Sequence, residues 1–291
     1  MSWNNVYEIE DLIRKNVIRG ASKVVEASLV ALKLKVKMLP KNSKEQLISE
    51  ILKYGEYISS LRPSMTSVRN YIYSATSEFK KLLERGTPIE ESLDVFAKKC
   101  DELIDKSRNT LTKISEYANE LIAEGDTILT HSYSNTVLGC LISAAKTKKI
   151  KVIVTESRPS MEGRETAYAL AKEGINVTLI VDAAVGTIIT SVDKVIVGAD
   201  SILPDNSIIN KIGTLLIALV AKEFQVPFIV VADSMKKSSS YEISIEEREP
   251  SEVLPENMLI DNITAKNPYF ELVSSRYLSY IITEEGIQML S

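Results

Sequence analysis

A carboxylate, an amide and an ammonium group lie close together in the second half of the chain. Asp200 comes shortly after the apolar run 194–197, and Asn210 and Lys211 follow it, just before Gly213. The run is typical of a strand buried on both faces, and open α/β sheets bind ligands beyond the carboxyl ends of such strands. The grouping predicts a site for a phosphorylated small molecule, with the ammonium and the glycine at the start of the next helix. An aspartate that only caps a turn is the alternative.

The same pattern recurs along the second half of the chain. Further apolar runs end in polar or ionisable residues, at 127–130, 151–154, 177–181 and 228–231, with a sixth strand expected at 280–283. The segments between them have helical periodicity and are long enough to cross over a parallel sheet, at 135–147, 161–173, 183–191 and 211–224. We therefore predict an α/β fold with a Rossmann-like, mostly parallel sheet and all candidate residues along one rim.

The first 120 residues have a different character. Apolar residues recur there at spacings of three and four, which is typical of amphipathic helices, and proline and glycine residues separate the helices. The pattern predicts four helices near 7–37, 43–60, 65–84 and 89–123. We expect a helical domain over 1–124 and a Rossmann-like domain, binding a sugar phosphate or nucleotide, over 125–291.

Composition excludes several classes of protein. The 291 residues are 45% apolar and 25% charged, as in globular proteins, and no apolar run is long enough to span a membrane. The start of the chain lacks the features of a signal peptide, and two cysteines with one histidine favour a cytoplasmic protein without a metal site. A net charge of −4 argues against nucleic acid as the direct partner. We expect no cofactor.

Two serines and the histidine follow the first predicted strand. Ser132 and Ser134 precede a helix near residue 135, so Ser134 can cap that helix, or both can face a phosphate at its N-terminus. His131 can act as a general base, but a single histidine in a turn is more often structural. Cys140, among apolar neighbours in the following helix, is most simply a buried thiol.

Three arginines stand beside residues with special backbone geometry. Arg158 precedes Pro159, which favours an extended, exposed conformation in which a guanidinium can fork onto phosphate oxygens. Arg19 precedes Gly20 and Ala21, and Arg62 precedes a proline. Each alone is most simply a surface cation. Converging with Lys211, they would form a phosphate cradle.

Taken together, these motifs resemble those of a known superfamily. It comprises the alpha, beta and delta subunits of translation initiation factor 2B, ribose-1,5-bisphosphate isomerase and methylthioribose-1-phosphate isomerase. The resemblance covers nearly the whole chain, and its motifs are Arg19-Gly20-Ala21, Arg62-Pro63-Ser64, Thr130-His131, Thr155-Glu156-Ser157-Arg158-Pro159, Gly198-Ala199-Asp200 and Asn210-Lys211-Ile212-Gly213-Thr214. Other stretches look like the alpha subunit of the initiation factor and like archaeal members.

One position departs from the isomerases. The resemblance implies that a cysteine directly after the Thr-His pair works with the aspartate of Gly-Ala-Asp to move protons between adjacent sugar carbons. Here Ser132 takes the place of that cysteine, while Asp200 is retained. A thiol can ionise near neutral pH, whereas a serine hydroxyl is a poor base unless another base activates it. Catalysis by Asp200 and Ser132 is therefore in question.

The sequence favours a regulatory protein like the alpha subunit of initiation factor 2B, which binds a sugar phosphate or nucleotide monophosphate and is not an enzyme. The alternatives are an aldose–ketose isomerase acting on ribose 1,5-bisphosphate or a related aldose 1-phosphate, and a purely structural subunit. The resemblance implies a homodimer through the sheet domains, or a dimer-based larger oligomer, and a partner in translation initiation factor 2 or its alpha subunit. The pocket is assigned to Arg19, Gly20, Ala21, Arg62, Arg158 and Lys211 for phosphate, Asp200 and Asn210 for sugar hydroxyls, and Ser132 and Ser134 as lining.

Overall fold

The computed structural model describes most of the chain as two compact units. The units comprise Met1–Thr110 and Leu111–Ser291. The described residues are 3, 5–18, 20–41, 43–241, 245–258, 260 and 262–290. None of the described helices is both long enough and apolar enough to cross a membrane.

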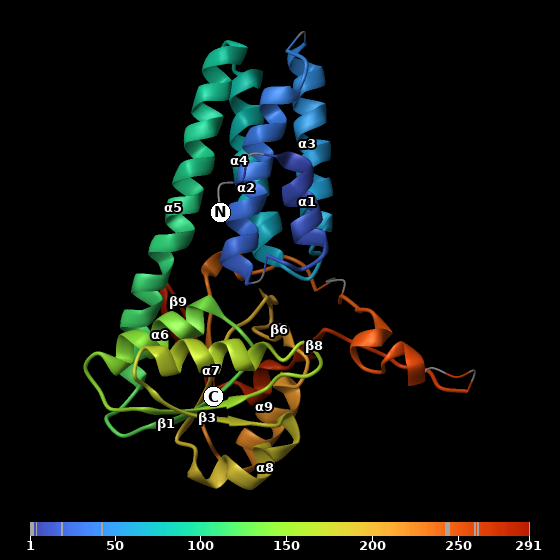
Figure 1. Cartoon of the computed structure of the whole chain (residues 1–291). Coiled ribbons are helices and arrows are strands. Elements are labelled where there is room, and N and C mark those ends of the chain that lie inside the picture. Colours follow the sequence, from blue (N-terminus) through green and yellow to red (C-terminus); the bar gives the residue numbers. More distant parts are fainter. Residues whose placement is uncertain are drawn as a thin grey trace. The chain divides into compact units, whose positions relative to one another are not determined.

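The first unit is helical, as its apolar spacing predicts (Figure 1). The predicted single helix over 7–37 is wrong, because two helices form that end at residue 14 and begin at residue 21. Between them, Asn16 and Gly20 have φ angles of 54° and 82°. The left-handed backbone of Asn16 ends the first helix, and the positive φ before the second helix suits glycine. The helices are α1 (Val6–Arg14), α2 (Ala21–Met38), α3 (Lys44–Ser60), α4 (Thr66–Glu84) and the first part of α5 (Ile89–Leu121).

The division between the units falls inside α5. Ile114 and Ala118, in the last part of α5, pack with Ile122 into the core of the second unit. The expected boundary was at residue 125, just before the first strand. The compact units divide earlier because this helix buries its end against the sheet that follows it in the sequence.

The second unit is built on a sheet flanked by helices (Figure 1). This sheet has seven strands. The strand order is β10-β9-β7-β4-β1-β2-β3, and every neighbouring pair is parallel except β9 with β10. This confirms the predicted helical region followed by an α/β fold with a mostly parallel sheet. The strands are β1 (Thr127–His131), β2 (Lys151–Thr155), β3 (Asn176–Ile180), β4 (Lys194–Val197), β7 (Phe228–Val231), β9 (Tyr280–Thr283) and β10 (Gly286–Met289).

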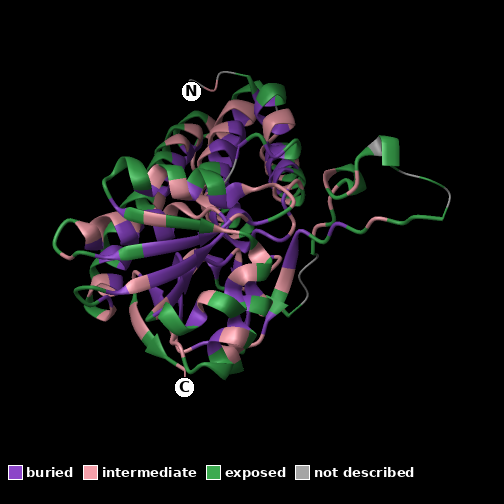
Figure 2. Ribbon diagram, turned by 60° about the horizontal axis from the view of Figure 1, so that its bottom comes forward, coloured by how far each residue is buried: buried purple, intermediate pink, exposed green. Residues whose placement is uncertain are grey.

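Successive side chains of the central strands enter two separate cores. Ile128 and Ile196 pack with the end of α5 and with α6 and α7, whereas Leu129 and Val195 pack with α8 and α9. Figure 2 shows these strands as buried, which explains their continuous apolar sequence. The helices are α6 (Asn135–Ala145), α7 (Glu162–Lys172), α8 (Val185–Ile188) and α9 (Thr214–Glu223), with short 3₁₀ turns at Asp182–Ala184, Ile189–Ser191, Ser234–Lys236, Pro250–Glu252, Glu256–Met258 and Ser275–Tyr277.

A second, antiparallel sheet changes the place of two predicted site residues. It consists of β5 (Ser201–Ile202), β6 (Ile208–Lys211) and β8 (Phe270–Val273), so that Asn210 and Lys211 both belong to β6. The prediction that Lys211 stands at a helix start is therefore wrong, since it ends β6 and pairs with Phe270 of β8. Helix α9 begins only at Thr214, after Gly213 with φ of 102°.

Candidate functional site

The order of the strands reverses between β1 and β4. From β1 the sheet extends through β2 to β3, and on the other side from β4 through β7 to β9. Such a switch point leaves a crevice beyond the carboxyl ends of the two central strands, where ligands bind in open α/β folds. Ser132 follows β1 and Asp200 follows β4, so these two predicted residues flank the switch point. The segments approach closely, because a Cβ on Gly198 would lie 2.8 Å from Ser134 Oγ.

The loop after β1 holds Ser132 in an unusual backbone conformation. Ser132 has φ of 64° and Ser157, in the loop after β2, has φ of 61°. The Ser132 backbone N–H donates to Ser157 Oγ at 2.7 Å, which joins the two loops. Left-handed backbone at residues other than glycine is uncommon and gathers at functional sites. The Ser132 hydroxyl donates to Glu162 Oε2 at 2.8 Å.

Glu162 accepts the hydrogen bond from the Ser132 hydroxyl, and the sequence did not predict it as a site residue. It begins α7 and is only 6% exposed. The next residue explains its burial, because a Cβ on Gly163 would lie 1.8 Å from the carbonyl oxygen of Thr155 at the end of β2. A glycine lets the start of α7 lie directly on the end of that strand.

Lys211 forms the other half of a buried ion pair. Its Nζ lies 2.9 Å from Glu162 Oε2 and 3.2 Å from the centre of the Tyr269 ring, and the side chain is 4% exposed. The Tyr269 hydroxyl donates to the other carboxylate oxygen, Glu162 Oε1. Ser132, Glu162, Lys211 and Tyr269 thus form one connected group, which we call the serine cluster.

Burial and charge act against each other in the serine cluster. Burial lowers the pKa of Lys211 to about 8, although the charges of Glu162 and Asp200 favour its protonated form. Burial also raises the pKa of Glu162, but the charge of Lys211 and hydrogen bonds from Tyr269, Lys211 and Ser132 outweigh it and leave this pKa lowered. Glu162 is therefore a carboxylate at neutral pH, and its hydrogen bond from Ser132 is a charge-assisted one.

Asp200 is half-buried near two buried ammonium groups. Its charge favours the protonated forms of Lys211 and of Lys236, whose Nζ donates to the carbonyl oxygen of Ala199. Burial nevertheless lowers the pKa of Lys236. Amines with shifted pKa values beside a carboxylate are characteristic of sites that transfer protons. Its position at the switch point makes Asp200 a candidate for such a transfer.

His131 faces a different set of groups from its neighbour Ser132. Its Nε2 lies 2.8 Å from the carbonyl oxygen of Ile212, so this nitrogen carries the proton and donates. Its Nδ1 lies 2.5 Å from Thr155 Oγ1 and 3.1 Å from Ser157 Oγ, and accepts from these hydroxyls. Burial lowers the pKa of His131, so the ring is neutral and both nitrogens are engaged. This supports the structural role considered for the histidine.

Asp182 orders the loop that carries Arg158. Its two carboxylate oxygens accept from the backbone N–H groups of Ser157 and Arg158, each at 2.8 Å. Arg158 is exposed, as expected for the residue before Pro159. We call His131, Thr155, Ser157 and Asp182 the histidine cluster.

Two further predicted ligand residues have hydrogen-bonding roles within the fold. Ser134 caps α6, with its hydroxyl accepting from the backbone N–H of Val137 at 3.3 Å, which is the alternative that the sequence left open. Asn210 is buried near the end of β6 and donates from Nδ2 to Thr214 Oγ1 at 3.0 Å. Contact of either residue with a ligand stays a prediction.

The remaining predicted ligand residues belong to the helical unit. Arg19 lies outside the described residues. Gly20 precedes α2 and Ala21 is its first residue. Arg62 is 4% exposed, and its Nη1 donates to Asn16 Oδ1 at 2.7 Å, so it is a buried side chain and not a surface cation. Convergence of these residues with Lys211 stays a prediction.

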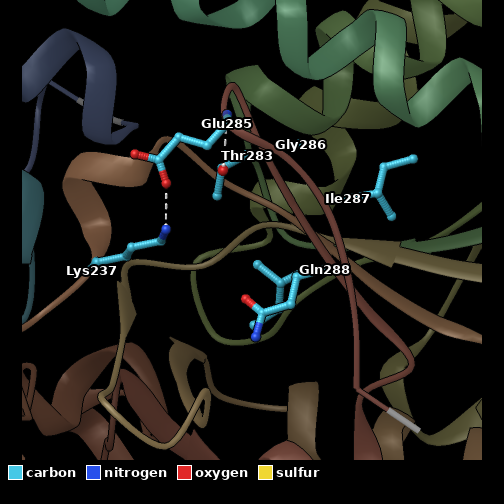
Figure 3. Close-up of a pocket in the computed structure, with 7 residues that line it drawn as sticks. Lys237, Thr283, Glu285, Gly286, Ile287 and Gln288 are labelled. Carbon is cyan, nitrogen blue, oxygen red and sulfur yellow. Dashed lines mark hydrogen bonds and ion pairs between the residues drawn. The ribbon is translucent and has the colours of Figure 1, made fainter.

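The described residues contain no cluster of three or more histidine, cysteine or acidic side chains that could hold a metal ion. Cys100 and Cys140 are free and buried, and burial raises the pKa of each thiol to about 12. A hollow of about 200 Å³ lies beside the β9–β10 hairpin, where Lys237 pairs with Glu285 (Figure 3). It is lined by residues other than those of the serine cluster.

The fold and its rim define an α/β protein with hydroxyl, carboxylate and ammonium groups gathered at a sheet switch point. Residues 17–289 match the Initiation factor 2 subunit family, and the chain belongs to that family. This confirms the resemblance found in the sequence.

Relatives in this family carry different names. The chain is 35% identical to a ribose 1,5-bisphosphate isomerase from Thermococcus kodakarensis, over 97% of this chain and 90% of that protein. It is 33% identical to a methylthioribose-1-phosphate isomerase from Acetivibrio thermocellus, over 97% and 88% of the two proteins. A solved structure described as the translation initiation factor eIF-2B of Pyrococcus horikoshii shares 29% identity, with a TM-score of 0.83 and coverage of 99% and 98% of the two chains.

The expectation that the chain is not an enzyme is wrong. Relatives that align with nearly its whole length are named isomerases, which indicates an enzyme. The expectation rested on the missing thiol at Ser132, and it did not take account of the carboxylate that contacts this serine.

Proposed function

We propose that the protein is an aldose–ketose isomerase of 1-phosphorylated pentoses, with ribose 1,5-bisphosphate as the first substrate to test. The observation that carries this proposal is the serine cluster at the switch point, with Asp200 at the end of the neighbouring strand. An isomerase needs two groups that exchange protons with adjacent parts of a sugar. The names of the relatives support the same reaction and substrate class.

The reaction needs no oxidant. A proton leaves the carbon next to the phosphorylated carbon, and the electron pair of that C–H bond forms a C=C double bond between the two carbons. At the same time the bond between the phosphorylated carbon and the ring oxygen breaks, and the ring oxygen takes up a proton. The enol then loses its hydroxyl proton and gains a proton at the phosphorylated carbon, which gives the ketose. In this proposal Asp200 exchanges protons with sugar oxygens, and Ser132 stands on the side of the carbon-bound proton.

Cations hold the substrate in this proposal. Lys211, with a pKa of about 8, is mostly protonated at neutral pH and stabilises negative charge on a phosphate or on the enolate oxygen. Arg158 holds phosphate from the exposed loop after β2. Phosphate contact by Arg19, Gly20, Ala21 and Arg62 stays a prediction. Asn210 and Ser134 contact sugar hydroxyls.

We also propose a homodimer through the sheet unit. Leu216, Leu219 and Phe224 are exposed apolar side chains on α9 and at its C-terminal end, as expected of a surface that another chain covers. The free, buried thiols suit the reducing cytoplasm, where we place the protein. Binding to translation initiation factor 2 stays a prediction.

The test is to incubate the purified protein with α-ribose 1,5-bisphosphate and follow ketose formation by ³¹P NMR, with methylthioribose 1-phosphate in parallel. We expect turnover of about 1 per second or faster with one of them. Binding is measured separately by thermal shift, where a hundredfold ligand excess over Kd adds about 2.7 kcal/mol. A folded protein that binds both sugars without turnover contradicts the isomerase proposal, and a flat melting temperature contradicts the site itself.

A further inference from the structure

The serine at position 132 needs a partner if it is to take part in proton transfer. A hydroxyl group ionises far above neutral pH, and serine becomes reactive in proteins when an adjacent base accepts its proton. In this chain the Ser132 hydroxyl is buried and donates to Glu162 Oε2 at 2.8 Å, within the range of a strong hydrogen bond to a carboxylate.

The surroundings of Glu162 keep this acceptor charged and fixed. Lys211 contacts the same oxygen from β6, and Tyr269, which precedes β8, donates to the other oxygen. Arg248 lies 5.0 Å from the Tyr269 ring, and Asp200 acts on Lys211 from the end of β4. The ammonium of Lys211 and the hydroxyls of Ser132 and Tyr269 therefore contact the carboxylate, so that it is ionised and aligned on Ser132.

From this geometry we infer that Glu162 accepts the hydroxyl proton of Ser132 during isomerisation, so that the two residues together replace a thiolate. The inference rests on the proposed function and assigns the chain's base to a residue that the sequence motifs did not single out. The exposed Glu165, one turn further along α7, provides a matched carboxylate outside the cluster.

The proton transfer balances without any further reactant. As the substrate C–H bond breaks, its electron pair stays on the sugar and its proton bonds to Ser132 Oγ. The original Ser132 O–H bond breaks at the same time, and that proton bonds to Glu162 Oε2, which becomes neutral. In the second half of the reaction Glu162 returns its proton to Ser132, and Ser132 delivers a proton to the neighbouring carbon.

The other groups near Ser132 are less suited to this role. His131 donates from Nε2 to a carbonyl oxygen, and its Nδ1 accepts from the hydroxyls of Thr155 and Ser157. Ser157 contacts the backbone N–H of Ser132 and has its own hydroxyl near His131.

The experiment compares Glu162→Gln in two backgrounds, the parent chain and Ser132→Cys. Glutamine keeps the size and hydrogen-bonding capacity of the side chain but accepts no proton. In the parent background we expect kcat to fall about a hundredfold, with KM changed much less. In the Ser132→Cys background the thiol can ionise without a partner base, so the same Glu162→Gln change should lower kcat by less than about tenfold. Glu165→Gln is the control and should leave kcat unchanged.

The two backgrounds separate a chemical role from a structural one. A structural loss, such as an unpaired Lys211, would lower kcat equally in both, and that result would overturn the inference. Circular dichroism and the thermal shift with inorganic phosphate report whether each variant folds and binds. If the parent is active and Glu162→Gln changes its kcat little, the inference is overturned but the proposed function stands. If the parent itself is inactive, both the proposed function and the inference are overturned.

Discussion

Two neighbouring residues of the rim, His131 and Ser132, belong to clusters of opposite character. The histidine cluster places a neutral ring among hydroxyls and a backbone carbonyl, and its carboxylate, Asp182, accepts from backbone N–H groups. The serine cluster buries a carboxylate and an ammonium group against each other. Adjacent residues of the chain thus belong to different clusters. The groups around His131 hold loops in place, whereas the groups around Ser132 carry charges that can act on a substrate.

This contrast indicates which buried polar groups point to chemistry. Satisfied neutral groups stabilise a loop at little cost, but a buried ion pair often contributes no more to stability than apolar residues of the same volume. In this protein the buried ion pair lies beside the hydroxyl of Ser132, a residue with left-handed backbone at a sheet switch point. That placement is better explained by reactivity than by stability.

The largest effect is expected from Asp200→Asn. The amide cannot exchange protons, so kcat for the sugar phosphate should fall about a thousandfold while the protein stays folded. Asp193→Asn, at the opposite end of β4, is the control and should retain kcat. Equal rates for Asp200→Asn and the parent would remove Asp200 from the reaction.

Lys211→Met tests the charge of the serine cluster. It leaves Glu162 buried without its ion pair, so unfolding by urea at neutral pH should show a loss of about 3 kcal/mol. In the parent the unfolded chain binds the Lys211 proton more tightly than the folded one, so stability should rise as pH increases from about 8 to 10.5. The Lys211→Met variant should lack that rise in stability. An equal rise in the parent and the variant would show that other groups cause it.

His131→Gln tests the histidine cluster. The folded pKa of His131 is lowered by burial, so the unfolded chain binds its proton preferentially and stability should fall as pH drops below about 6.5. One proton accounts for at most about 1.4 kcal/mol per pH unit. Urea unfolding from neutral to mildly acidic pH should show a shallower fall in the variant. A loss of kcat at neutral pH as large as that of the Asp200 variant would contradict the division between the clusters.

The smallest effect is expected from Arg158→Ala. The side chain is exposed, so the free energy of unfolding should change by less than about 0.5 kcal/mol. Loss of one phosphate contact should raise KM about fivefold, equivalent to about 1 kcal/mol. Arg276→Ala, in the 3₁₀ turn before β9 and thus on the opposite rim of the sheet, is the control. An unchanged KM in both would place the phosphate elsewhere.

The sheet could be predicted from the sequence because each central strand is buried on both faces and forms a continuous apolar run. The break before α2 could not, because Val17 and Ile18 continue the apolar spacing across it. The strand that ends at Lys211 was missed because its pairing with β8 joins residues far apart in the sequence.

The central residue of the candidate site was missed for a related reason. A glutamate in the first turn of a helix is ordinarily a surface residue favoured by the helix dipole. The burial of Glu162 depends on how closely α7 lies on β2, a contact between segments that only the folded chain brings together. A carboxylate directly before a glycine, just after the Arg158-Pro159 loop, was the available signal.

The contact at Gly163 limits how this rim can be redesigned. A Cβ there would lie 1.8 Å from the Thr155 carbonyl oxygen, so any other residue must lift the start of α7 from the strand. The hydrogen bond from Ser132 to Glu162 would then lengthen beyond its working range. A mutant library that seeks new sugar specificity at this site should therefore vary the residues around the ligand and keep position 163 fixed as glycine.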